Sequence, residues 1–198
     1  MINTEDVTAF FDRLAPGWDA SIVRNEQVIA KILSNAKAAE GKDVLDVACG
    51  TGVLIPDYLE RKVSSVTAID ISPKMAEIAR AKFPQANVTV ICGDVEKTDF
   101  KRLFDCIVVY NAFPHFPDPE RLVGHLASLL KAGGILTIAH GMSREKINAH
   151  HSGSARPVSN GLMSVEELGQ IFEKYLQVTT LISDDQMYQA AGEKRPEN

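Results

Sequence analysis

Three acidic residues and a pair of glycines follow apolar runs of the chain, where a ligand site could form. The run VLDVACGTGVL (44–54) carries Asp46 and then the turn residues Gly50 and Gly52, while SVTAID ends in Asp70 and NVTVICGD ends in Asp94. Glycines let a backbone turn tightly and approach a ligand closely. A carboxylate accepts both hydroxyls of a ribose or a proton from an adenine amino group. The pattern predicts a nucleoside site.

Each of these features also has a purely structural interpretation. Asp70 stands before Ser-Pro and would then only cap a helix, and Asp94 after Gly93 would only make a turn. The ends of three predicted strands all carry residues that suit the same nucleoside, and this agreement favours the binding interpretation over the structural one. A dinucleotide is excluded, because Gly50-Thr51-Gly52 is followed by Val, Leu, Ile and Pro rather than by the third glycine of that motif.

Alternating elements must position these residues. We predict helices at 5–14 and 19–39, the second ended by Gly41, and then strands at 43–48, 65–70, 87–94, 104–111 and 135–141. The intervening helices are predicted at 53–62, 72–83 and 119–134, with Gly133 as the stop signal. A helix at 164–176 opens with the capping box Ser164 and Glu167.

The order of the elements predicts an α/β fold with helices on both faces of a sheet. Strands that alternate with helices form right-handed crossovers and pair in parallel. The last two predicted strands, 177–183 and 187–193, are separated by too few residues for a crossover, so they must form an antiparallel hairpin. The prediction is a mixed sheet of seven strands.

The motifs together resemble the class I S-adenosylmethionine-dependent methyltransferases. The resemblance rests on VLDVACGTG, AIDISPKM, GDVEK, FDCIVVYNAFPHFPDP and LLKAGGILTIAHG, and it runs from about residue 7 to 192. It implies a Rossmann-like sheet of order 3-2-1-4-5-7-6 in one domain, 1–198, with an N-terminal helical lid (1–40), a parallel core (41–142) and a substrate-side C-terminal part (143–198). FFDRLAPGWD is similar to the branch that includes ubiquinone and menaquinone methyltransferases.

The resemblance assigns S-adenosyl-L-methionine as cofactor and gives a role to ten residues. Asp70 would hold the ribose, and Asn111 would lie beside the methionyl end. One departure is Ala48, where many members of the family have glycine. The remaining positions are the methionine-side turn Asp46, Ala48, Gly50 and Gly52, and the adenine-side residues Ile71, Met75, Asp94 and Val95.

Histidines are the residues that could act as a base on the acceptor. Histidine titrates near neutral pH and can take a proton from an attacking hydroxyl, thiol or amine. His115 is the first candidate because it follows the strand whose end faces the methionyl group, and His140 is the second. His150 and His151 follow the fifth strand. Loop histidines that cap helices or face water are the alternative, and no metal is expected because no carboxylate or cysteine joins them at a ligand spacing.

Bulk properties restrict the partners and the compartment. The chain has 198 residues and a formal net charge of −5, without a Lys/Arg cluster, so nucleic acid is not an expected partner. There is no signal-peptide pattern or membrane span, and the three cysteines are expected to be inert packing residues, which indicates a cytoplasmic protein.

The expected activity is methyl transfer to a small-molecule acceptor, whose attacked atom (O, S, N or C) stays open. Trp18, Phe113 and Phe116 are predicted to wall the acceptor pocket, or else to be packing residues. Residues 1–20 are predicted to form a mobile lid. A homodimer is compatible with the sequence, and a non-catalytic S-adenosylmethionine-binding module is the alternative function.

Overall fold

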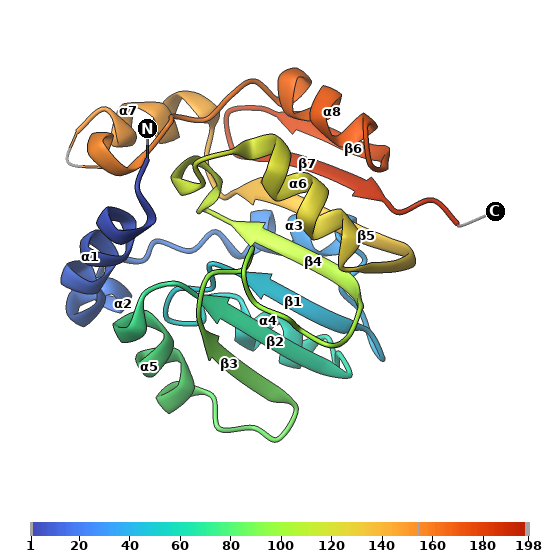
Figure 1. The fold of residues 1–198 in the computed structure, drawn as a ribbon, viewed down its shortest axis with the longest axis horizontal. Helices are drawn as coiled ribbons and strands as arrows, with labels where there is room; N and C mark the ends of the chain where they lie inside the picture. The colour runs from blue at the N-terminus through green and yellow to red at the C-terminus, as the bar shows by residue number, and fades with distance from the viewer. Residues whose placement is uncertain (1, 154, 197–198) are drawn as a thin grey trace.

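The computed structural model describes residues 2–153 and 155–196, which form a seven-stranded sheet in the order β3-β2-β1-β4-β5-β7-β6 (Figure 1). The first five strands run parallel, and β7 is antiparallel to both β5 and β6, which confirms the predicted mixed sheet with its terminal hairpin. The strands are β1 Asp43–Val47, β2 Ser65–Asp70, β3 Val88–Cys92, β4 Phe104–Tyr110, β5 Leu130–His140, β6 Gln177–Ser183 and β7 Tyr188–Glu193.

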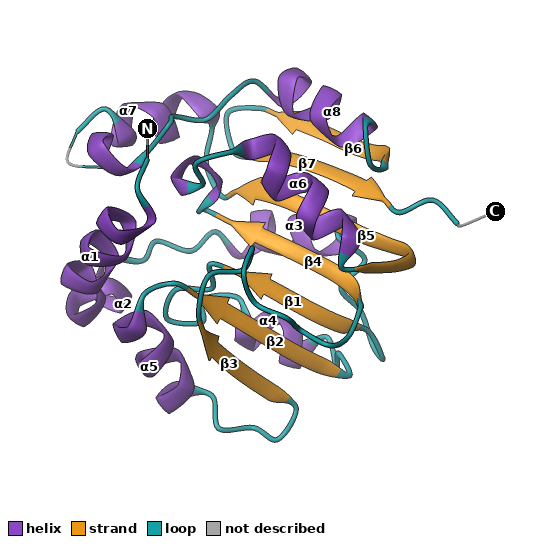
Figure 2. Ribbon diagram, in the orientation of Figure 1, coloured by secondary structure: helices purple, strands orange, loops and turns teal. Residues whose placement is uncertain are grey.

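Helices cover both faces of this sheet (Figure 2). Successive side chains of a strand point to opposite faces. In β1, Leu45 and Val47 therefore join a core with α6 and α8, whereas Val44 joins a second core with α3 and α4. The helices are α1 Thr4–Leu14, α2 Trp18–Ser21, α3 Glu26–Asn35, α4 Ile55–Glu60, α5 Pro73–Lys82, α6 Pro119–Ser128, α7 Arg144–His151 and α8 Val165–Glu173, with 3-10 turns η1 Ala15–Gly17, η2 Phe113–His115 and η3 Arg156–Val158.

Side-chain caps fix where several helices begin. Ser72 accepts a hydrogen bond from the Met75 backbone N–H at the start of α5, and Asp118 accepts one at the start of α6. Ser164 and Glu167 form the predicted reciprocal capping box of α8. A cap satisfies backbone N–H groups that have no partner within the helix. These starts were therefore readable from local sequence.

The predicted helix at 19–39 is two helices. Trp18–Ser21 forms α2, and α3 begins only at Glu26, where the Asn25 side chain accepts a hydrogen bond from the Val28 N–H. The helix then ends at Asn35 rather than near Gly41, because Lys37 takes a positive φ of 54° that a helix cannot continue through.

The glycine pair in β5 marks an irregularity of the sheet and not the end of a helix. Helix α6 ends at Ser128, and β5 pairs Leu130 with Phe104 before its register resumes at Ile135 opposite Cys106. Gly133 has a φ of 73°, and a side chain at Gly134 would meet three backbone carbonyl oxygens at 2.9–3.1 Å. Backbone packing, which local sequence does not reveal, thus overrides the helical pattern.

Helix α7 was not predicted. Only Ile147 among its residues is buried, so the segment carries no apolar periodicity that would signal a helix. Ser143 caps its start, and His150 and His151 lie in its last turn rather than in a loop.

The carboxyl ends of the parallel strands meet at one edge of the sheet, the left side of Figure 1, beside α1, α2 and α7. Open α/β sheets bind their ligands at this edge. Among residues 2–153 and 155–196, no helix combines the length and apolar character needed to cross a bilayer.

The tight backbone around Gly134 gives the first prediction. Gly134→Ala should lower the free energy of unfolding by about 1–3 kcal/mol, because its methyl group overlaps carbonyl oxygens that the sheet holds in place. Urea unfolding measures this change. Gly17→Ala is the matched control, since nothing lies within 4 Å of that added methyl group, and its effect should stay below about 1 kcal/mol. Equal effects of the two substitutions would contradict the explanation of the bulge.

Candidate active site

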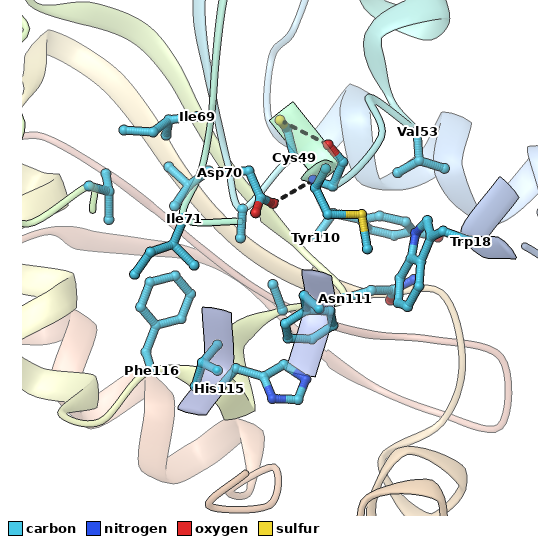
Figure 3. Close-up of a pocket in the computed structure, with 18 of the residues that line it drawn as sticks. Trp18, Cys49, Val53, Ile69, Asp70, Ile71, Tyr110, Asn111, His115 and Phe116 are labelled. Atoms are coloured by element: carbon cyan, nitrogen blue, oxygen red, sulfur yellow. Dashed lines mark hydrogen bonds between the residues drawn. The ribbon is translucent and has the colours of Figure 1, made fainter. Parts of the chain in front are cut away.

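A cavity of about 500 Å³ lies at the carboxyl ends of the parallel strands (Figure 3). Its wall combines the glycine turn after β1, the ends of β2 and β4, and the N-terminal helices. Eight of the ten residues that the resemblance assigns to the cofactor line it. These are Ala48, Gly50, Asp70, Ile71, Met75, Asp94, Val95 and Asn111.

The turn after β1 is built from three residues with left-handed backbone conformations. Ala48, Gly50 and Gly52 have φ values of 53°, 57° and 84°. Such values favour glycine, which explains physically why glycine is common at the position of Ala48 in the resembled family. At Gly50 an added Cβ would lie 3.6 Å from the Trp18 Nε1 atom, so the indole lies over the turn.

Asp70 connects the end of β2 to both the turn and the next helix. Its Oδ2 accepts a hydrogen bond from the Gly50 N–H at 2.8 Å (Figure 3). Its Oδ1 accepts one from the Ser72 N–H at 2.8 Å. Burial raises the pKa of Asp70 to about 6, although these two N–H groups oppose the shift. A carboxylate has about four acceptor sites. The side chain, which lines the cavity, therefore keeps acceptor capacity for a ligand.

Asp46 and Gly52 do not line the cavity. Asp46 is buried, one of its carboxylate oxygens has no hydrogen-bond partner among the described residues, and burial together with Asp70 raises its pKa to about 8. A side chain at Gly52 would meet the Phe83 ring at 2.6 Å. In this structure both residues shape the turn from behind, and neither has a cavity-lining position.

The adenine-side residues form one end of the cavity. Met75 and Val95 are buried apolar side chains, and Ile71 is half-buried beside them. Asp94 Oδ1 accepts a hydrogen bond from the Glu96 N–H at 3.0 Å, and its other oxygen lies 3.1 Å from the Lys97 Nζ. This end is an apolar slot with a carboxylate at its edge.

Asn111 fixes the end of β4 against the end of β5. Its backbone has a φ of 55°, its N–H donates to the Ala139 carbonyl, and its Oδ1 accepts from the Gly141 N–H at 2.9 Å. Asparagine tolerates this left-handed conformation better than most residues. The amide side chain thus has a set orientation on the cavity wall.

His115 lines the cavity with a defined tautomer. Its Nδ1 lies 2.8 Å from the Val158 carbonyl oxygen, which can only accept, so Nδ1 carries the proton and Nε2 has a free lone pair. Burial lowers the pKa of His115, which keeps the ring neutral at pH 7. Phe11 packs edge-on against the ring, with centroids 4.9 Å apart.

His140 was expected near the acceptor as a second base, and that position is wrong. It ends β5 in the interior, fully buried, with neither ring nitrogen hydrogen-bonded among the described residues, and it is not part of the cavity wall. Burial lowers the pKa of His140 to about 3. Because both faces of the sheet are covered, all residues of β5 from Ile135 to His140 are buried, and His140 lies in the core rather than on the cavity wall.

The other residues predicted to wall the acceptor pocket fall into two groups. Trp18 and Phe116 line the cavity, whereas Phe113 is buried in the core beside α6. Cys49 and Cys106 are buried as expected, but Cys92 is exposed at the edge strand β3, so its assignment to packing is wrong. Within the described part of the chain no group of three or more His, Cys, Asp or Glu residues is placed to hold a metal ion.

Polar contacts that sequence did not indicate hold the N-terminal helices on the cavity rim. Asp12 accepts hydrogen bonds from the Ser72 Oγ at 2.5 Å and the Lys74 N–H at 3.1 Å. Asp19 accepts from the Thr51 Oγ1 at 2.5 Å and from the Lys82 Nζ at 2.9 Å. These long-range pairs have no local sequence signature.

Arg24 is a further cavity residue that the sequence did not single out. Its guanidinium pairs with Asp57 at 2.9 Å and with Glu26 at 2.8 Å, and it donates to the Val53 carbonyl. It thereby links the segment before α3 to the turn that follows β1.

Comparison with known proteins identifies the class. Residues 44–134 match the family of methyltransferase domains. The chain is 33% identical over 143 residues to a malonyl-[acyl-carrier protein] O-methyltransferase of Acetivibrio thermocellus, covering 70% of this chain and 50% of that one. It is 31% identical over 143 residues to a ubiquinone biosynthesis O-methyltransferase of Coxiella burnetii, covering 68% and 61%. The chain thus spans about half to three fifths of these relatives.

The fold agrees with this class. The N-methyltransferase NodS of Bradyrhizobium japonicum, crystallised with S-adenosyl-L-homocysteine, superposes with a TM-score of 0.75 at 16% identity, over 98% of this chain and 100% of that one. The sheet order is the one that the resemblance implied. The chain therefore carries a methyltransferase domain with the class I fold, which confirms the resemblance found in the sequence.

The buried carboxyl of Asp46 makes stability depend on pH. The native state holds this proton up to a pKa of about 8, whereas the unfolded chain releases it near 3.8, so stability falls as pH rises through this range. The lowered pKa values of His115, His140 and His151 act in the opposite sense, but only below about 6.5.

Between pH 6.5 and 8 the free energy of unfolding of the ligand-free protein should therefore fall by about 1 kcal/mol per pH unit. Chemical denaturation at several pH values measures the slope. Asp46→Asn, which keeps the shape and removes the titration, should flatten it. An unchanged slope in Asp46→Asn would show that another group carries the proton.

Proposed function

We propose that this protein transfers a methyl group from S-adenosyl-L-methionine to a small-molecule acceptor. The observation that carries the proposal is the single cavity that brings together the glycine turn, Asp70 and Asp94 from three successive strand ends. No one of these features is specific alone, but a turn for close approach, a buried carboxylate and an apolar slot together fit one nucleoside with a polar tail.

The cavity residues fit the cofactor in chemical terms. Asp70, with acceptor sites left after binding two backbone N–H groups, would receive the ribose hydroxyls. Met75 and Ile71 would contact the faces of the adenine, and Asp94 its amino group. The backbone at Gly50 would approach the methionine part, and Asn111 would flank it. The cofactor supplies an electrophilic methyl group on a sulfonium.

Positioning is the main demand of the reaction. Displacement at a methyl group proceeds in line, so the nucleophile must lie directly behind it. The wall of the same cavity also includes Phe11, Phe116 and His150, which have no assigned role toward the cofactor, and we assign them to the acceptor. A non-catalytic binding module would lack an acceptor space, and formation of S-adenosylhomocysteine with any acceptor separates the enzyme from such a module.

His115 is the proposed base for acceptors that must lose a proton. Its Nδ1–H is bound to the Val158 carbonyl, which orients the ring and leaves the Nε2 lone pair to receive a proton. Its lowered pKa keeps it unprotonated at neutral pH, in the form that a base requires.

The attacked atom stays open between O, S, N and C. The two relatives above are O-methyltransferases, which favours an oxygen nucleophile, but this chain covers only part of their lengths. A homodimer and a cytoplasmic location remain predictions from the sequence, and light scattering on the purified protein would decide the first.

Loss of the Asp70 carboxylate tests the cofactor assignment. Asp70→Asn should weaken S-adenosylmethionine binding at least about tenfold, because the amide nitrogen cannot accept from a ribose hydroxyl, an expected loss on the order of 1–3 kcal/mol. Calorimetry measures the affinity, and circular dichroism checks that the variant is folded. Asp99→Asn is the control, since that exposed carboxylate lies outside the cavity. Tight binding of NAD by the wild type would overturn the proposal.

Substitution of His115 tests the base. With labelled cofactor and a panel of phenols, thiols, amines and quinols, His115→Ala should lose a factor of about 10²–10⁴ in kcat while cofactor affinity stays unchanged. His125→Gln is the control, because that histidine lies on α6 outside both cavities, and its kcat should remain within about threefold. A loss of less than about threefold in His115→Ala would leave His115 as a wall residue.

The N-terminal helices are proposed as a lid that orders when the cofactor binds. They contribute Phe11 and Trp18 to the cavity and are held at its rim by the polar contacts of Asp12 and Asp19. Backbone amides of residues 4–21 should exchange with deuterium more slowly after the cofactor is added, measured by mass spectrometry. Asp19→Asn should speed exchange there in the free protein, and full protection without ligand would rule the lid out.

A further inference from the structure

A second cavity, of about 520 Å³, adjoins the first and has no role in the function proposed above. It lies between η2, α7 and the segment that runs from η3 to Met163. The Phe116 side chain is common to the walls of both cavities.

The charged groups of the second cavity are all basic. Arg144 and Arg156 line it, together with His151, and no aspartate or glutamate does. The chain as a whole carries a net charge of −5, so this cavity differs in sign from the net charge of the protein.

Both guanidinium groups keep donors available. Arg144 donates through Nε to the Leu162 carbonyl at 2.9 Å, which fixes the side chain but uses one donor of five. Within the described ranges neither Arg144 nor Arg156 forms an ion pair. Glu167, on α8, is an acid whose pKa the charge of Arg144 helps to lower. Its carboxylate accepts hydrogen bonds from the Ser164 Oγ and N–H, each at 2.8 Å.

Hydrogen bonds make the rest of the wall rigid. Asn148 Nδ2 donates to the Leu162 carbonyl at 3.1 Å, and its Oδ1 accepts from the Leu162 N–H at 2.6 Å. Asn160 Nδ2 donates to the Phe116 carbonyl at 3.1 Å. The polar side chains that remain free to meet a ligand are therefore mainly the two arginines.

The proposed base lies at the boundary of the two cavities. The ring of His115, on the wall of the first cavity, packs against the ring of His151, on the wall of the second, with centroids 4.9 Å apart. His151 Nδ1 lies 2.6 Å from the Ser159 Oγ, and His115 Nδ1 is bound to the adjacent Val158 carbonyl. One short segment therefore orients both rings.

We propose that the second cavity binds an anionic group of the methyl acceptor, a carboxylate or a phosphate, through Arg144 and Arg156. An acceptor anchored there would extend past Phe116 and place its nucleophile near His115 in the first cavity. The planar guanidinium forms paired hydrogen bonds with such groups, which gives orientation as well as attraction. The claim that the bound carboxylate or phosphate belongs to the acceptor rests on the proposed methyl transfer. The claim that the second cavity binds an anion does not depend on that function.

Anion binding is tested without knowledge of the acceptor. Inorganic phosphate and acetate are titrated separately into ¹⁵N-labelled full-length protein at constant ionic strength, because surface charge effects change with salt. At least one of the two should produce saturable shifts in the amides of Arg156, Ser159 and Gly161. The Arg144→Gln/Arg156→Gln double variant should weaken that binding at least tenfold.

The control is Arg195→Gln, which removes one positive charge from an exposed residue outside both cavities and should bind as the wild type does. Stronger binding of phosphate or of acetate tells which anion the cavity prefers. Absence of saturable shifts with both probes, or equal shifts in the double variant, would overturn the proposal whether or not the protein transfers methyl groups.

Matched acceptors test the second half of the proposal. Pairs that differ only in an acidic group, such as 3-mercaptopropionate with propanethiol and 4-hydroxyphenylacetate with 4-ethylphenol, are compared by formation of S-adenosylhomocysteine. The acidic member should have at least a tenfold higher kcat/KM, and the double variant should lower kcat/KM of the acidic member at least tenfold more than that of the neutral member. Equal turnover within each pair would refute the acceptor role, whereas no product with any acceptor would count against the methyl transfer itself.

Discussion

The carboxylate of Asp70 is the interaction on which the site depends. Its two oxygens receive the N–H groups of Gly50 and Ser72, each at 2.8 Å, so one buried side chain holds the turn after β1 and the start of α5 against the end of β2. Without these bonds, the N–H groups of the half-buried Gly50 and the buried Ser72 would lack these partners. The proposed cofactor binding and the local folding therefore share one residue.

The same region places two carboxyl groups in the protein interior. Asp46 and Asp70 are both buried, and burial raises the pKa of both carboxyls. Such placement costs free energy that a purely structural turn would not require. Buried groups with shifted pKa values gather at functional sites, and here they surround the turn that faces the cavity.

The acceptor side is built differently, from segments that the sheet does not constrain. Phe11 and Trp18 come from the N-terminal helices, and His115 and Phe116 come from the short turn after β4. Their placement depends on contacts across long sequence separations, such as Asp19 with Thr51 and His115 with Val158. The proposed acceptor side therefore depends on these segments, whereas the proposed cofactor side depends mainly on the strand ends.

The sequence by itself determined the sheet, its terminal hairpin, the capped helix starts at Ser72 and Ser164, and most of the cofactor side of the cavity. These features follow from local rules, namely alternation of apolar runs, caps and glycine turns, that act over a few residues. Only the tertiary structure decided that His140 points inward, that Gly133 and Gly134 form a bulge and that Arg144 and Arg156 share a cavity. Those outcomes depend on which side chains meet across the fold, and no pattern within a single segment records such meetings.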